Sequence, residues 1–277
     1  IIRPLAVTVA ESKLGSADDM VYPRGPIPWF TNIPFHVGIV GEKLSLMIKG
    51  DIELIAQTHR KPNIILILAD DLGYGNLTCY MPGGKIKTPN IDKLAQGGLR
   101  FTRFYSGSTV CAPSRCALMT GRDMGHAYIR GNVAEANLRP QDTTLAQRLH
   151  DAGYATGMFG KWGLGDVSTE STPQSKGFDE FFGNLYHLNA EEEPERPYYP
   201  KNDTAWVKAN APRGVLHSFA DGKIDDTGPL NRKRMETIDE ETLEAAKEFI
   251  ARQQRSGQPF FCWWNATRMH FRTHVKE

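Results

Sequence analysis

The sequence of 277 residues has no excess of charge of either sign and few cysteines. Lys and Arg number 33 and Asp and Glu number 32, so the formal net charge is +1. This balance argues against a polybasic protein that binds nucleic acid, and no nucleic-acid partner is expected. The four cysteines are too few for a disulfide scaffold, and none belongs to a Cys-x-x-Cys pair.

Long apolar runs are missing as well. The longest uninterrupted run is Ile64–Ala69, far shorter than the roughly 20 residues of a membrane-spanning helix. We therefore expect no membrane span. Residues 1–20 lack a basic stretch followed by an apolar one, so no secretory signal peptide is visible. Either such a signal has been removed or the chain is a fragment.

From Lys61 onward, apolar β-rich segments alternate with helix signals. Strands are expected at residues 64–69, 99–105, 154–159 and 259–264. Helices are expected at 88–97, 114–120, 143–152 and 237–254, the last opened by a capping box that begins at Thr237. This alternation predicts an α/β fold with a mainly parallel central sheet flanked by helices.

The chain divides by composition into two parts. Residues 1–60 contain a proline-rich stretch and no site chemistry, and we interpret them as an N-terminal extension of unknown role. Residues 61–277 form the main domain. Within it, residues 166–235 are rich in Gly, Pro and charged side chains, which predicts long loops near a functional site.

Two adjacent carboxylates, Asp70 and Asp71, follow the first predicted buried strand. The carboxyl end of such a strand is where open α/β sheets bind their ligands. Two like charges this close need a counter-charge, which a hard cation such as Ca²⁺ or Mg²⁺ supplies. A helix cap or a solvated turn would explain the pair equally simply.

The segment Cys111–Arg115 reads Cys-Ala-Pro-Ser-Arg and is more specific. Pro113 at a helix start places Cys111 near the positive end of the helix dipole. Arg115, four residues on, is able to face the same anion. Cys111 is then either a thiolate nucleophile with a low pKa or a buried structural cysteine, and its chemistry alone does not decide between them.

These motifs together resemble the formylglycine-dependent sulfatases. Cys111–Arg115 followed by Ala-Leu-Met-Thr-Gly-Arg is similar to the signature of that family. The strand ending in Asp70-Asp71 resembles its first metal-binding segment. Further segments resemble family sequences in the same order, namely Thr88–Asp92, Gly125–Asn132 and Gly153–Trp162. The resemblance runs from about Lys61 to the end and implies an alkaline-phosphatase-like α/β fold.

The resemblance implies a covalent mechanism. A separate formylglycine-generating maturation enzyme would oxidise Cys111 to Cα-formylglycine, whose aldehyde hydrates to a geminal diol. One hydroxyl would attack sulfur, and the other would then expel sulfate and restore the aldehyde. An ordinary serine would be left holding a stable sulfate ester, which explains why the modification is needed.

The resemblance also implies the role of each site residue. Asp70, Asp71 and the modified Cys111 would bind one divalent cation, usually Ca²⁺. Arg115 would stabilise the formylglycine side chain, and Lys161 would contact the sulfate. A solvated lysine at a strand end is the simpler interpretation of Lys161. A histidine would donate a proton to the leaving alkoxide, and this role falls to His270, with His274 as the weaker candidate.

The sequence departs from the family pattern in two places. Many members have a histidine after the Gly-Lys-Trp segment, where this chain has Gly163, and His126 or His187 are candidates to replace it. The family's later Asp-Asn or Asp-Gln pair and its second lysine have no counterpart before Glu277, since Asp225-Asp226 comes too early. We therefore expect an N-terminal portion of a longer, arylsulfatase-like enzyme, without its C-terminal subdomain and with doubtful activity alone.

The expected function is hydrolysis of sulfate esters, on a sulfated glycan or a sulfate-ester small molecule. The alternatives are a phosphonate or phosphate ester hydrolase of the same superfamily and a non-catalytic pseudoenzyme fragment. The family also implies a periplasmic or secreted location.

Overall fold

A computed structural model describes residues 61–132, 136–185, 193–270 and 273–276, and the backbone of four strands nearer the N-terminus. The chain divides into the unit Ser12–Pro62 and a larger unit made of Ile1–Glu11 and Asn63–Glu277. In the smaller unit, three strands pair antiparallel in the order β2-β3-β4; they are β2 (His36–Val40), β3 (Lys43–Ile48) and β4 (Ile52–Ile55). The role of residues 1–60 remains a prediction.

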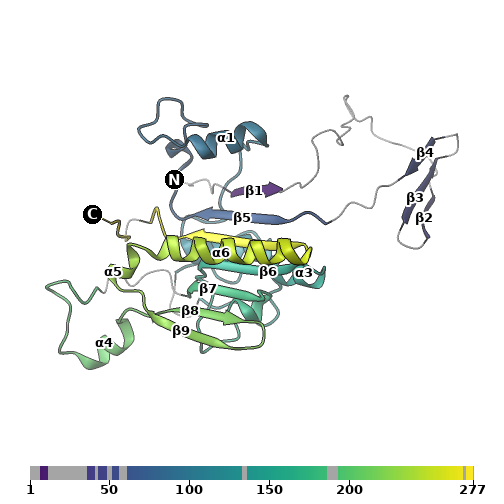
Figure 1. The fold of residues 1–277 in the computed structure, drawn as a ribbon. Helices are drawn as coiled ribbons and strands as arrows, with labels where there is room; N and C mark the ends of the chain where they lie inside the picture. Colours follow the sequence, from purple (N-terminus) through teal and green to yellow (C-terminus); the bar gives the residue numbers. More distant parts are fainter. Residues whose placement is uncertain are drawn as a thin grey trace. The chain divides into compact units, whose positions relative to one another are not determined.

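The larger unit is built on a seven-stranded sheet with the order β1-β5-β10-β6-β7-β8-β9 (Figure 1). The central strands β5, β10, β6 and β7 are parallel, and antiparallel strands β1, β8 and β9 extend the two edges. The predicted α/β class with a mainly parallel central sheet is confirmed. The strand bounds are β1 (Val7–Glu11), β5 (Ile64–Ala69), β6 (Ala155–Lys161), β7 (Glu180–Asn184), β8 (Gly214–Phe219), β9 (Ile224–Pro229) and β10 (Phe260–Ala266).

Three of the described helices begin where the sequence signals predict. Thr88, Thr144 and Thr237 are the N-caps of α1, α3 and α6. The capping box predicted at Thr237 is wrong, because its side chain makes no bond to the helix backbone and instead bonds Glu241 at 2.9 Å. None of the described helices is long and apolar enough to cross a membrane. Their bounds are α1 (Pro89–Gly97), α2 (Cys111–Thr120), α3 (Leu145–Asp151), α4 (Thr204–Asn210), α5 (Arg232–Met235) and α6 (Ile238–Ser256).

Helices cover both faces of the central strands. Along β10, Phe261 and Trp263 join the apolar cluster that contains residues of α2 and α3. The alternate residues Phe260 and Cys262 join a second cluster against α6, which lies along the sheet in Figure 1. Burial on both faces explains why these strands are continuous apolar runs instead of alternating ones.

The strand predicted at residues 99–105 is wrong. The described structure has no strand there, and Leu99, Phe101 and Tyr105 are 78%, 54% and 60% exposed. Partial alternation of apolar and polar residues indicates a segment that is able to join a sheet. A strand forms only where a neighbouring strand offers backbone groups for hydrogen bonds. Within the described residues, no strand pairs with this segment.

The long loops predicted for residues 166–235 are also wrong in part. This stretch contains β7, α4, β8, β9 and α5. The strands β8 and β9 form a hairpin whose outer strand is mostly exposed, so it has little of the apolar content by which buried strands are recognised. Because β8 runs antiparallel to β7, the connection that carries α4 lies at the carboxyl-terminal edge of the parallel strands (Figure 1).

Candidate active site

Three central strands bring polar side chains to one edge of the sheet. Asp70 directly follows β5, Lys161 is the last residue of β6, and Asn265 is next to last in β10. Because these strands are parallel, their carboxyl ends meet at one edge, where open α/β sheets bind ligands. All three residues are buried, with exposures of 8%, 1% and 0%, so each needs a polar partner.

The helix α2 adds Cys111 and Arg115 to this edge. α2 begins at Cys111 and not at Ser114 as predicted, so the two residues stand one helical turn apart on the same face. Cys111 Sγ lies 3.9 Å from Asp70 Oδ1. Arg115 Nη2 lies 3.9 Å from Asp70 Oδ2. The structure therefore brings together the cysteine, the arginine and the first carboxylate of the sequence motifs.

Lys161 is paired with Asp70 in the interior. Its ammonium donates to Asp70 Oδ2, and its side chain is 1% exposed, so a solvated lysine at a strand end is excluded. Burial alone would raise the pKa of Asp70, but the charges of Lys161 and Arg115 hold it below its usual value of 3.8. Burial lowers the pKa of Lys161, and repulsion from Arg115 lowers it further against the attraction of Asp70. Two buried cations thus share one carboxylate.

Arg115 is held by hydrogen bonds from two strands. Its Nη1 donates to the Lys161 carbonyl at 2.6 Å, and its Nη2 donates to Asn265 Oδ1 at 3.1 Å. The guanidinium carbon lies 5.9 Å from the ring centre of Trp263. Its buried Nε has no hydrogen-bond partner among the described residues. This orphaned donor lies 3.6 Å from the Cβ position of Gly163.

Gly163 stands beside Arg115 where many relatives were expected to carry a histidine. Its φ is +72°, and a Cβ at this position would lie 3.1 Å from Arg115 Cδ. The glycine therefore leaves room for the arginine side chain. Of the two candidate substitutes, His126 is exposed and faces Asp123 at 2.9 Å, and His187 lies outside the described residues.

Gly163→Ala is expected to lower the free energy of unfolding by about 2–3 kcal/mol, through left-handed backbone strain and the contact with Arg115. Gly222→Ala is the matched control, because Gly222 has a φ of +86° but nothing within 4 Å of its Cβ position. It is expected to cost only about 1–2 kcal/mol. Urea unfolding of both variants checks the difference, and equal losses would show that Arg115 does not crowd position 163.

His270 lies on the segment after β10 and is buried. The backbone N–H of Met269 donates to the carbonyl of Asp70 at 2.7 Å, which ties this segment to the site. Attraction from a protonated His270 is the smallest of the causes that lower the pKa of Asp70. The competing His274 instead bonds Glu193 through its Nε2.

Asp239 in the first turn of α6 fixes the segment that carries His270. Its Oδ1 accepts hydrogen bonds from the backbone N–H of Thr267 at 2.6 Å and from its hydroxyl at 2.9 Å. Its Oδ2 accepts from the backbone N–H of Arg268 at 3.2 Å. Asp239 and Thr267 are buried, so no solvent replaces these bonds.

Asp239→Ala is expected to lower the free energy of unfolding by about 2–4 kcal/mol, because it leaves buried donors without an acceptor. Asp123→Ala is the control, since Asp123 also accepts a backbone N–H, from Gly125 at 2.7 Å, but its side chain is 72% exposed. Urea unfolding compares the two, and a loss at Asp239 no larger than at Asp123 would contradict the anchoring role.

The donor set fits a hard cation only in part. Asp70 and Asp71 offer carboxylate oxygens, the ligands that Ca²⁺ prefers. However, Asp70 is bound to Lys161, and Asp71 is exposed with a φ of +59°. Among the described residues, no group of three or more His, Cys, Asp or Glu side chains is placed to hold a metal ion. These residues do not make a complete cation site by themselves.

Sequence reasoning missed three residues of the site, Asn132, Asp239 and Asn265. Asn132 Oδ1 accepts from the backbone N–H of Ala112 at 2.9 Å and so caps the start of α2. Each of the three acts by bonding a residue distant in the sequence, and only the tertiary fold reveals such a partner. The one signal in the sequence was the polar Asn265 inside an otherwise apolar strand.

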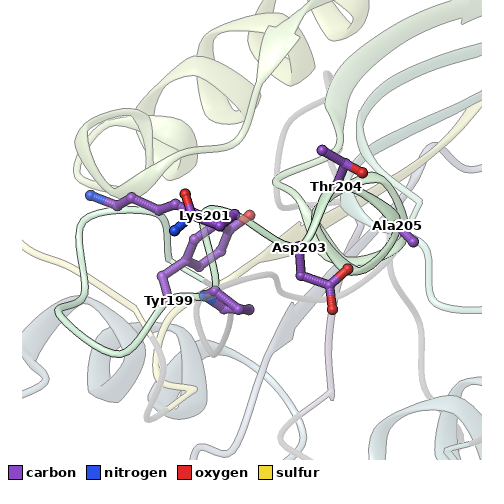
Figure 2. A pocket seen from close by; sticks show the side chains of 7 residues that line it. Tyr199, Lys201, Asp203, Thr204 and Ala205 are labelled. Carbon is purple, nitrogen blue, oxygen red and sulfur yellow. The ribbon is translucent and has the colours of Figure 1, made fainter.

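A cavity of about 790 Å³ lies on the segment between β7 and β8, away from these residues (Figure 2). It is lined by consecutive residues from Tyr199 to Ala205 and contains none of the site residues described above. Asp203 caps α4 there by accepting from the backbone N–H of Trp206 at 2.9 Å. The lining therefore reflects how this loop turns into α4.

Comparisons with a family model and with individual relatives point to the same family. Residues 62–276 match the family model described as Sulfatase. Human arylsulfatase A is 34% identical over 218 residues, covering 76% of this chain and 42% of the relative. The N-acetylgalactosamine-6-sulfatase of Canis lupus familiaris is 33% identical over 230 residues, covering 78% of this chain and 41% of the relative.

A solved structure supports the same conclusion. The PsFucS1 sulfatase from Pseudoalteromonas sp. superimposes with a TM-score of 0.66 at 30% sequence identity, covering 76% of this chain and 44% of that structure. The chain thus spans about two fifths of the length of the curated relatives described above, 42% and 41%.

Proposed function

Since the chain belongs to the sulfatase family, we propose that the protein containing it hydrolyses sulfate esters at the edge of the sheet where Asp70, Cys111, Arg115 and Lys161 meet. One observation carries this proposal: two buried cations, Arg115 and Lys161, face a single carboxylate. The resulting positive charge suits a sulfate monoester, which carries one negative charge, and it lies within reach of Cys111.

Cys111 is proposed as the origin of the nucleophile. Once oxidised to formylglycine, it would supply a hydrated aldehyde, of which one hydroxyl forms the bond to sulfur and the other releases sulfate. Arg115, one helical turn after Cys111, would donate to an oxygen of the hydrated aldehyde. Arg115 would therefore orient the nucleophile.

Lys161 and His270 are proposed to act on the ester. The Lys161 ammonium would bind a sulfate oxygen and stabilise the charge that develops as the S–O bond to the alcohol breaks. His270 would give its proton to the departing alkoxide oxygen. Lys161 forms an ion pair with Asp70, and the backbone N–H of Met269, the residue before His270, donates to the carbonyl of Asp70.

We propose Ca²⁺ as the divalent cation of the complete protein, with Asp70, Asp71 and the modified Cys111 among its ligands. The chemistry supplied by a bound cation would be Lewis-acid stabilisation of the negative charge of the ester. The remaining ligands would come from outside the described residues, since those residues form no complete cation site. Lys161 bonds only Oδ2 of Asp70, so Oδ1 of the same carboxylate would serve as the cation ligand.

The substrate class is proposed to be a sulfated carbohydrate. The name of the N-acetylgalactosamine-6-sulfatase, which is 33% identical to this chain, supports this choice. A formylglycine-generating maturation enzyme is the other partner that the proposal requires.

The test is hydrolysis of an aryl sulfate and of the matching aryl phosphate by the protein containing this chain, expressed together with a maturation enzyme. We expect a higher kcat/KM for the sulfate, because its single charge suits the site better than the double charge of a phosphate monoester. A preference for phosphate would favour a phosphate ester hydrolase, and inactivity toward both would favour a non-catalytic protein.

A further inference from the structure

The amide of Asn265 lies at the centre of the charged site, and the proposed mechanism does not use it. Asn265 is 0% exposed and belongs to β10, whose other buried residues are mostly apolar. An amide buried in this way is costly unless its oxygen and its NH₂ group are both hydrogen-bonded. Its partners therefore indicate what the residue does.

Asn265 closes a ring of hydrogen bonds between three elements. Its Oδ1 accepts from Arg115 Nη2 of α2 at 3.1 Å, and its Nδ2 donates to the carbonyl of Lys161 in β6. Arg115 Nη1 donates to that same carbonyl at 2.6 Å. One amide thus joins the side chain of one site cation to the backbone of the other.

This ring sets where the guanidinium lies. Asp70 is the anion beside Arg115, and its Oδ2 is 3.9 Å from Nη2. On the other side, Gly163 leaves space next to the arginine, with 3.1 Å from Arg115 Cδ to the Cβ position. Without the Asn265 oxygen, Nη2 would be a buried donor with no acceptor, and Asp70 is the acceptor it would turn to.

We propose that Asn265 is a positioning residue that holds Arg115 beside Cys111 and keeps its ion pair with Asp70 at 3.9 Å, too long for a direct hydrogen bond. An effect of Asn265 on kcat rests on the proposed function. Its effect on the position of the Arg115 guanidinium does not, because it follows from the hydrogen bonds of the ring alone.

The first test is ¹⁵N NMR of the arginine side chains in the 277-residue chain. In the wild type, the two bonded Nη groups should slow rotation of the Arg115 guanidinium and give separate Nη signals, assigned by their loss in Arg115→Lys. Asn265→Ala should merge or shift these signals. Asn265→Asp keeps the accepting oxygen and the shape of the side chain, so the separate signals should persist.

The control variant is Asn63→Ala. Asn63 also uses its Oδ1 to bond β10, accepting from the backbone N–H of Phe260 at 3.3 Å, but at the opposite end of the strand. It should leave the Arg115 signals unchanged. Unchanged Arg115 signals in Asn265→Ala, or their loss in Asn63→Ala, would overturn the positioning role, whether or not the protein hydrolyses sulfate esters.

The second test is steady-state kinetics of the complete protein, normalised to its formylglycine content. Asn265→Ala should lower kcat by about 10²-fold with KM within about threefold, as a misplaced catalytic group does. A merely structural role would lower the active fraction and leave kcat per active site unchanged. An active wild type with an equally active variant would overturn this inference alone, whereas an inactive wild type would count against the proposed function.

Discussion

Cys111→Ser is expected to stop turnover, with a loss of kcat of at least roughly 10³-fold. A serine hydroxyl in this position can still attack sulfur and displace the alcohol. It has no second hydroxyl on the same carbon, so it cannot expel the sulfate, and the variant should accumulate a sulfate ester on the introduced serine. Intact-protein mass spectrometry after incubation with an aryl sulfate should therefore show the added mass of one SO₃ group.

Cys79→Ser provides the matched control for this experiment. Cys79 is also a free and only partly buried cysteine, but it lies on the loop before α1, where its backbone N–H donates to Asp92 at 2.8 Å. This variant should keep wild-type turnover and show no added mass. Multiple turnovers by Cys111→Ser at the wild-type rate would exclude Cys111 as the origin of the nucleophile.

Asp70→Asn is expected to destabilise the cation-free chain by about 3–5 kcal/mol, because it leaves two buried cations without their carboxylate. The side chains of Lys161 and Arg115 are 1% and 3% exposed, so water does not screen their repulsion. Urea unfolding at neutral pH without added divalent cation measures the effect. Asp166→Asn, which breaks an exposed pair with Arg213, is the control and should cost at most about 1 kcal/mol.

The difference in unfolding free energy between the wild type and Asp70→Asn should become smaller as the pH falls. The pKa of Asp70 lies below its usual value of 3.8 in the folded chain, so its ionised form contributes stability above the unfolded pKa. That contribution is lost as the pH falls through the lowered folded pKa. The stability of the wild type should then approach that of Asp70→Asn in acid below pH 3.8. A difference that stays constant across this range would show that the ion pair does not stabilise the fold.

Much of the fold could be predicted from local patterns. The run at Ile64–Ala69 indicated a strand buried on both faces. β5 is a strand inside the sheet between β1 and β10, with Leu66 and Leu68 buried and its other residues partly buried. Helix starts at Thr88, Thr144 and Thr237 were recognisable because the preference for Thr at a helix start is a local sequence signal, although only Thr144 makes the side-chain capping bond. The failure at residues 99–105 has the opposite cause, since a strand depends on a partner that no local pattern names.

The site could be predicted only where a motif supplied it. The four-residue spacing suggested that Arg115 faces the same anion as Cys111, although the helix was predicted to begin only at Ser114. Asp70 was placed at the end of a buried strand, and Lys161 was assigned to the site only by the resemblance. The ion pair between Asp70 and Lys161 joins residues 91 positions apart, and the bond of Asn265 to Arg115 joins residues 150 apart. Such pairs follow from the order of strands in the sheet, which the sequence pattern did not provide.

The proposed function depends most directly on the oxidation of Cys111 to formylglycine. The chain should be expressed with a formylglycine-generating enzyme, digested, and the peptide containing Cys111 measured by mass spectrometry. An aldehyde in place of the thiol, absent when the maturation enzyme is omitted, is the predicted result. A peptide that keeps its sulfur and is fully alkylated by iodoacetamide under both conditions would contradict the central claim.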